Sequence, residues 1–300
     1  MSRPAETATQ EAQVAGLPVW SGKVAIEPLH GGLSNASFLV RDGSGAYVAR
    51  LGRDFPFHHV DRAREAMVTQ AAVDLGFAPE LVYSAPGVMV SRFIDGHTFT
   101  AQDVRARRDD VADLLRRFHN EMGRQVRGSG FIFWVFHVIR DYARTLDAGG
   151  SRLAGRLPEF LAIAGEMETE QVPMPIVFGH HDLLPANVID DGNRLWLIDF
   201  EYAGFGTAMF DLAGIASNAD FGEDEAEALL CTYLGDRPMP AFIRAHAAMQ
   251  VASLLRETLW SLVSELHLDA PGVDYVAYTA ETLASYEAAL ASYRLRFGKG

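Results

Sequence analysis

Three oxygen-bearing side chains, Asp182, Asn187 and Asp199, lie in one short stretch of the sequence. This stretch reads HHDLLPANVI, continues through the turn residues 190–193, and ends in the apolar run LWLID. Turn residues between two β-prone runs predict a hairpin, which would bring Asn187 and Asp199 to the same open end of the strands and near Asp182. Carboxylate and amide oxygens suit Mg²⁺, and a separate carboxylate can accept the proton of an attacking hydroxyl. The spacing therefore favours phosphoryl transfer, with Asp182 as base and Asn187 and Asp199 as metal ligands, over unrelated turn residues.

The secondary structure that must position these groups changes along the chain, from mainly strands to mainly helices. The 300 residues, 49% hydrophobic and 22% charged, can bury one sizeable core or two modest ones. Helical periodicity appears at 62–75, at 131–142 and generally from residue 101 onward, except for 176–201, which predicts strands and turns. We predict an α+β chain with a flexible leader (1–16), a small antiparallel β lobe (17–95) and a larger, mainly helical lobe (96–300). The short strands predicted in the small lobe are 24–29, 36–40, 46–51, 81–84 and 88–93.

Composition excludes several classes of function. A formal net charge of −13, with no dense run of lysine or arginine, disfavours a nucleic-acid partner, because phosphate backbones require a basic surface. No apolar stretch is long enough to predict a membrane span, and the first 16 residues lack the apolar core of a signal peptide. The single cysteine, Cys231, excludes an internal disulfide. We therefore expect a cytoplasmic protein with neither nucleic-acid nor membrane partners.

The segment GHHDLLPANVI…LWLIDFEYAGFGTAMFDLA resembles the choline/ethanolamine kinase branch of the aminoglycoside phosphotransferase and choline kinase superfamily, whose pattern is H-x-D-x4-N followed by a strand-borne Asp. The likeness is most specific over 178–213 and extends in weaker form over 24–296. It implies a protein-kinase-like bilobal fold, with ATP and Mg²⁺ as cofactors and a small, cationic, hydroxylated molecule as acceptor. It also implies that His180 is the motif histidine and that Asp211 is a buried carboxylate bracing the catalytic loop.

The predicted small lobe carries candidate nucleotide-binding residues. A glycine pair between two strands allows backbone amides to approach phosphates, although such a pair is also common in simple turns. Arg50 ends the following strand, where kinases place the cation that holds the α- and β-phosphates, and Glu65 lies on the next helix, where the ion-pair partner of that cation belongs. The choline kinase branch carries arginine at this strand position. The predicted nucleotide-binding residues are Gly31, Gly32, Ser34, Asn35, Arg50 and Glu65.

Signals for the acceptor are fewer. Glu257 and Trp260 share a helix face, and a carboxylate beside an indole ring can hold an organic cation, although a Trp on such a helix also suits the core. Glu201 and Tyr202 match the D-[FW]-E-Y pattern of the family. We therefore predict that Glu201, Tyr202, Glu257 and Trp260 bind the acceptor. The chain departs from the family at two positions, Asn218 and Val263, which disfavours choline itself.

Alternative functions remain open at this point. The doublet His181-Asp182, with His119 as a further ligand, also occurs in metal-dependent phosphohydrolases, but there it lies on helices rather than before a proline and a hairpin. A kinase-like binding module without catalysis would be expected to lack the base or a metal ligand, whereas all three are present. Among kinases, the sequence leaves aminoglycosides, thiamine, homoserine and other small alcohols open as acceptors.

Overall fold

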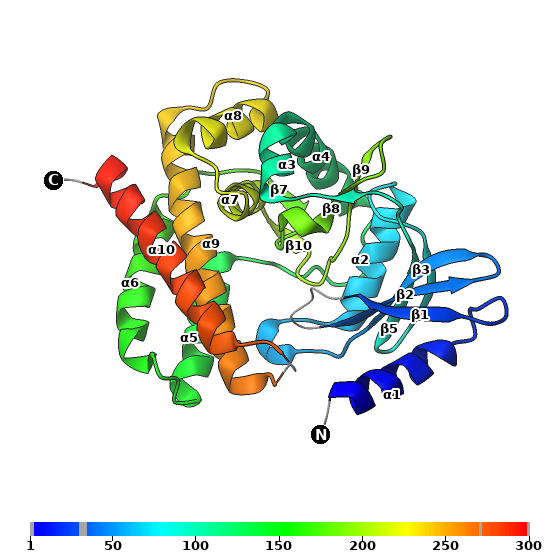
Figure 1. Ribbon diagram of the computed structural model, residues 1–300. Helices are drawn as coiled ribbons and strands as arrows, with labels where there is room; N and C mark the ends of the chain where they lie inside the picture. The colour runs from blue at the N-terminus through cyan, green and yellow to red at the C-terminus, as the bar shows by residue number, and fades with distance from the viewer. Residues whose placement is uncertain (1–2, 30–34, 270–271, 299–300) are drawn as a thin grey trace. The chain divides into compact units, whose positions relative to one another are not determined.

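The computed structural model describes residues 3–29, 35–269 and 272–298 (Figure 1). By the packing of its backbone the chain divides into two compact units, each built from several segments. Unit 1 comprises Met1–His97, Ile189–Glu201 and Asp269–Val273, and unit 2 comprises Thr98–Val188, Tyr202–Leu268 and Asp274–Gly300. The boundaries of the two lobes predicted from the sequence stay a prediction.

Unit 1 is built on an antiparallel five-stranded sheet with the order β1-β2-β3-β5-β4. The register pairs Ser37 of β2 with Arg50 of β3, and Arg50 in turn with Met89 of β5, so Arg50 lies in a central strand near its end. Alternating buried side chains on these strands form one core cluster with Val14 of the N-terminal helix. The strands are β1 (Ala25–Leu29), β2 (Ala36–Asp42), β3 (Gly45–Leu51), β4 (Leu81–Ala85) and β5 (Val88–Arg92).

Two helices belong to unit 1, α1 (Arg3–Ala15) and α2 (Arg62–Asp74). Helix α2 begins after Asp61, whose side chain accepts a hydrogen bond from the Arg64 amide, and it ends before Gly76, whose φ of 75° suits a helix terminus. Helix α1 falls inside the segment expected to be a flexible leader. It contacts the sheet core through Val14, whose carbonyl accepts a 2.6 Å hydrogen bond from the Trp20 indole. The flexibility of this segment stays a prediction.

The predicted turn at 190–193 lies between two short neighbouring strands, β8 (Val188–Asp190) and β9 (Leu195–Leu197). Asp191 Oδ1 accepts hydrogen bonds from two amides in this turn, and Gly192 has a φ of 84°. The Leu197 amide donates to the Phe77 carbonyl at 2.8 Å, which fixes β9 within unit 1 next to the end of α2. Asp199 lies two residues after the end of β9. A further two-residue strand, β6 (His97–Thr98), marks the chain boundary between the units.

Unit 2 is mainly helical and includes a small antiparallel sheet of β7 (Ile176–Gly179) and β10 (Gly204–Thr207). Its centre is the long helix α9, against which α5, α6, α7 and α10 pack, and α10 runs along α9 (Figure 1). No helix of the described part of the chain is both long and apolar enough to cross a membrane. The helices are α3 (Ala101–Ala106), α4 (Arg108–Glu121), α5 (Val135–Ala148), α6 (Leu157–Thr169), α7 (Ala208–Asn218), α8 (Glu223–Leu234), α9 (Pro240–His267) and α10 (Tyr275–Phe297).

Helix α5 begins later than the predicted residue 131. The amide of Phe205 donates to the Phe131 carbonyl at 2.7 Å, and the amide of Phe133 donates to the Phe205 carbonyl at 2.8 Å. Residues 131–133 are therefore held by pairing with β10 rather than by helical hydrogen bonds. With this difference, the predicted α+β class, with an antiparallel sheet and a large helical part, is confirmed.

Candidate active site

The loop after β7 in unit 2 carries the H-x-D pattern and is held by one carboxylate. Asp211, in the first turn of α7, accepts hydrogen bonds from the amides of His180 and His181, each at 2.7 Å, and its Oδ2 lies 2.8 Å from Nε2 of His119. Asp211 is 1% exposed. Burial alone would raise its pKa, but the His119 hydrogen bond and the nearby imidazoles lower it below its ordinary value. Asp211 thus stays ionised and fixes the backbone that leads to Asp182.

His181 has a left-handed backbone with a φ of 62°. Its ring stacks on Phe133 at 4.4 Å between centroids, and its Nδ1 lies 3.3 Å from the Tyr202 carbonyl, to which it donates in the neutral tautomer. Gly206 leaves room for the ring, because a Cβ there would lie 2.9 Å from Nε2 of His181. Burial lowers the pKa of His181 to about 4. The histidine beside the proposed base is therefore neutral near pH 7.

This burial predicts an acid-sensitive fold. His181 protonates near pH 6.5 when unfolded but only near 4 when folded, so its stabilising contribution is complete above pH 6.5 and is lost as the pH falls towards 4. The loss should reach roughly 3 kcal/mol for one histidine. Urea unfolding between pH 7 and 4 measures it. His181→Asn, which tolerates the left-handed backbone, should flatten the pH dependence, and the exposed His137→Asn should not. An unchanged slope in His181→Asn would contradict this assignment.

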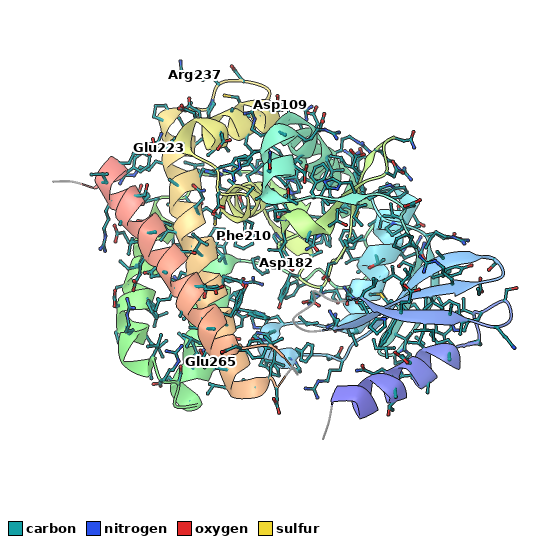
Figure 2. The ribbon with its side chains drawn as sticks, viewed as in Figure 1. Asp109, Asp182, Phe210, Glu223, Arg237 and Glu265 are labelled. Atoms are coloured by element: carbon teal, nitrogen blue, oxygen red, sulfur yellow. The ribbon has the colours of Figure 1, made fainter. Side chains whose placement is uncertain are left out.

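Asp182 and Asn187 lie on one loop, and a hydrogen bond links the two residues. Nδ2 of Asn187 donates to the Asp182 carbonyl at 2.8 Å, and the Leu184 amide donates to the same oxygen at 3.0 Å. Burial raises the pKa of Tyr278, and the negative charges of Glu257 and Asp182 raise it further. Burial alone would lower the pKa of Arg256, but Glu257 and, more weakly, Asp182 contribute to raising it above its ordinary value. Figure 2 shows Asp182 on this loop. The candidate base thus lies within electrostatic reach of α9 and α10.

Three of the predicted acceptor residues meet in unit 2. The Trp260 indole donates to the Tyr202 hydroxyl at 2.8 Å, and the Tyr278 hydroxyl donates to Oε1 of Glu257 at 2.7 Å. The second oxygen of Glu257 accepts a hydrogen bond from Arg256 at 2.9 Å. The Arg256 guanidinium lies over the Tyr202 ring at 4.5 Å from its centroid. These contacts define an aromatic and acidic cluster that already contains one cation, Arg256, which the sequence reasoning missed.

In unit 1 the strand-end arginine, Arg50, contacts Glu65, its predicted partner, and also Asp199, which the sequence suggested only as a metal ligand. Arg50 Nη1 lies 2.6 Å from Oδ1 of Asp199, and Arg50 Nη2 contacts Oε1 of Glu65. Burial alone would lower the pKa of Arg50, but the carboxylates of Asp199 and Glu201 raise it above its ordinary value. Asp199 has a φ of 68°, a backbone uncommon for residues other than glycine and often found at functional positions.

The fourth predicted acceptor residue, Glu201, lies instead with this group in unit 1. Its Oε2 is 2.8 Å from Nη1 of Arg62 and 3.3 Å from Nδ2 of Asn35. Of the other predicted nucleotide-binding residues, Gly31, Gly32 and Ser34 lie outside the described residues. Arg62 was not singled out from the sequence, although its i,i+3 spacing to Glu65 in the first turn of a predicted helix was a usable signal.

The residues present have the chemistry to hold a divalent metal ion. One carboxylate oxygen from each of Glu65, Asp199 and Glu201 lies within 4.8 Å of the other two. Asn187 uses its amide nitrogen toward Asp182, which orients the amide and leaves its oxygen as the hard-ligand atom. Two of these carboxylates, Glu65 and Glu201, are ion-paired with Arg62. Each unit therefore supplies, by itself, oxygen ligands of the kind that Mg²⁺ prefers.

The chain is similar to known proteins in sequence and in fold. The model of a family described as "Phosphotransferase enzyme family" matches residues 25–246. The chain is 24% identical over 246 residues to Protein LicA of Haemophilus influenzae, covering 77% of this chain and 70% of that protein. It is 26% identical over 207 residues to a probable ethanolamine kinase of Arabidopsis thaliana, covering 63% of this chain and 54% of that protein. A crystal structure of a choline/ethanolamine kinase family protein from Mesorhizobium loti superposes with a TM-score of 0.77 at 28% identity, covering 95% and 94% of the two chains.

Proposed function

Because this chain belongs to the phosphotransferase enzyme family and is a small-molecule kinase, we propose that it transfers the γ-phosphate of ATP, with Mg²⁺, to the hydroxyl of a small cationic alcohol similar to choline or ethanolamine. The predicted kinase-like fold and family are confirmed by the same comparisons. The donor, the metal and the acceptor are our proposals. We also propose the cytoplasm as its location, where ATP is supplied.

The proposal rests on the residues found in two clusters of side chains, each of which lies within one unit. Unit 1 holds Arg50 paired with Glu65, as in the basic–acidic ion pair that kinases need in place, and holds Asp199 beside this pair. Unit 2 holds Asp182 and Asn187 on one braced loop. We propose that Asp182 orients and deprotonates the acceptor hydroxyl and that Asn187 and Asp199 bind Mg²⁺. The bound metal would neutralise charge on the transferred phosphoryl group.

The cluster around Tyr202 supports a cationic acceptor. Asp182 and Glu257 contribute two negative charges and Arg256 one positive charge, so a monovalent cation would balance this part of unit 2. Arg256 already lies over the ring of Tyr202, and the neighbouring rings of Trp260 and Tyr278 would provide the aromatic surface for such a cation.

A larger amine is a second candidate acceptor. A cavity of about 640 Å³ is lined by residues of α7, α8, α9 and α10, and its lining includes Glu257, Tyr278 and Glu281. This volume lies within the range of small-molecule sites. An aminoglycoside-like acceptor would therefore find acidic groups beyond the cluster itself.

The test compares acceptors that differ in charge but hardly in shape. ATP consumption with choline, ethanolamine and 3,3-dimethylbutan-1-ol, the neutral analogue of choline, should favour the two cations by about tenfold or more. Trp260→Phe should raise the acceptor KM more than the ATP KM, with a melting curve to show that it is folded. Excess EDTA should abolish turnover. Equal rates for charged and neutral acceptors would contradict the proposed acceptor class, and full turnover in EDTA would contradict the proposed metal.

A further inference from the structure

Arg62 lies at the centre of the unit 1 cluster and contacts four groups. Its Nη1 lies 2.6 Å from Glu65 Oε2 and 2.8 Å from Glu201 Oε2, its Nη2 donates to Asn35 Oδ1 at 2.7 Å, and its Nε donates to the Arg53 carbonyl at 2.9 Å. The Arg62 side chain is 10% exposed, and those of Glu65 and Glu201 are 1% and 6% exposed. A planar guanidinium suits this use of several donors at once, and a lysine ammonium would not reproduce it.

The positive charge of Arg62 balances part of the negative charge that the three carboxylates bring into this cluster. Glu65, Asp199 and Glu201 bring three negative charges into a space where their oxygens lie within 4.8 Å of one another. Arg50 and Arg62 supply two positive charges, so the group carries one net negative charge. Arg62 pairs with both buried glutamates, and Arg50 pairs with Glu65 and with Asp199, whose side chain is 29% exposed. The most exposed carboxylate is therefore the one expected to bind metal.

We propose that Arg62 is a positioning residue that reserves Asp199 for the divalent metal ion by holding Glu65 and Glu201 in ion pairs. This inference rests on the proposed use of Mg²⁺ and a nucleotide. Arg62 touches neither ligand in this role. It acts through Glu201, which it keeps neutralised, and through Asn35, which borders the segment expected to approach phosphates.

Removal of Arg62 should change metal and nucleotide affinities in opposite directions. In Arg62→Gln, Glu201 loses its ion-pair partner and the cluster gains one net negative charge, so Mn²⁺ should bind about five- to tenfold more tightly in the absence of nucleotide. The same extra charge repels a polyphosphate and leaves a carboxylate that competes for its metal, so ATP with Mg²⁺ should bind about tenfold more weakly. A residue with only a structural role would lower the melting temperature without tightening metal binding.

The experiment titrates the full-length protein with Mn²⁺ alone, followed by electron paramagnetic resonance, and separately with ATP and Mg²⁺ by calorimetry. Arg62→Lys keeps the positive charge but not the planar guanidinium with its several N–H donors. This variant should therefore retain Mn²⁺ affinity within about twofold and lose part of the ATP affinity. Arg41→Gln is the matched control, because Arg41 is another arginine of unit 1, on β2, in an exposed pair with Glu27 at 3.3 Å. This control should change neither affinity.

A double variant separates the charge of Glu201 from general disturbance. Arg62→Gln combined with Glu201→Gln removes one charge of each sign, and Mn²⁺ affinity should return to within about twofold of the wild type. If Arg62→Gln alone does not fold, the double variant still tests the proposal. Tighter Mn²⁺ binding by the double variant than by the wild type would contradict it. Unchanged or weaker Mn²⁺ binding by folded Arg62→Gln would overturn it directly. Failure of the wild type to bind ATP would instead refute the proposed function.

Discussion

Asp182→Asn should bind ATP and Mg²⁺ nearly as the wild type does and lose about 10²- to 10⁴-fold in turnover, which is the usual contribution of a general base. An amide keeps the shape of the carboxylate but cannot accept the hydroxyl proton. The loop should keep its form in this variant, because Asn187 and Leu184 bond to the backbone carbonyl of Asp182 rather than to its side chain. The measurements are kcat, the ATP dissociation constant and a melting curve.

A comparison of the two aspartates tests the division of roles between them. Asp199→Asn should lower the apparent Mg²⁺ affinity as well as the rate, because the substitution weakens a metal ligand, whereas Asp182→Asn should leave the Mg²⁺ dependence unchanged. Asp113→Asn, on the exposed face of α4, is the control and should change neither quantity. A folded Asp182→Asn enzyme with turnover within about twofold of the wild type would reject the general-base role.

The parts predicted well from the sequence are those whose determinants are local. The strands and turns of unit 1 follow from alternating apolar residues and glycine-rich turns, and α2 lies within about a residue of its predicted bounds, because Asp61 and Gly76 terminate it by local chemistry. The roles predicted for Asp182 and Asn187 stay predictions, but the hydrogen bond between them is local in the same sense. It joins residues only five positions apart in sequence.

The parts that were missed depend on contacts between distant segments. Periodicity alone placed a helix start at residue 131, whereas pairing with Phe205 holds residues 131–133 in an extended form. Arg62 was not selected because its partners Glu201 and Asn35 lie 139 and 27 residues away in sequence. Arg256 was overlooked for a related reason: an arginine on an amphipathic helix predicts an exposed face, yet Arg256 is 4% exposed and packs over Tyr202.

Loss of the Asp211 carboxylate should cost more stability than any other single change considered for unit 2. Asp211→Ala would leave the amides of His180 and His181 and the ring of His119 without their acceptor inside a buried region. An unsatisfied buried donor costs about 1–3 kcal/mol, so the loss for all three donors should be roughly 3–9 kcal/mol. Because whole domains are stable by only about 5–15 kcal/mol, this variant should be marginally folded at best.

Asp211→Asn makes the same prediction measurable if the alanine variant does not fold. An asparagine keeps one acceptor oxygen but turns an NH₂ group toward one of the three donors, so it should lose about half as much free energy of unfolding as Asp211→Ala. Urea unfolding measures both, with Asp113→Ala on the exposed face of α4 as a control that should change stability by less than about 0.5 kcal/mol. Since the lost bonds hold the backbone immediately before Asp182, folded Asp211→Asn should also have a lower kcat. Wild-type stability in Asp211→Asn would show that the donors find other acceptors and that Asp211 does not brace the loop.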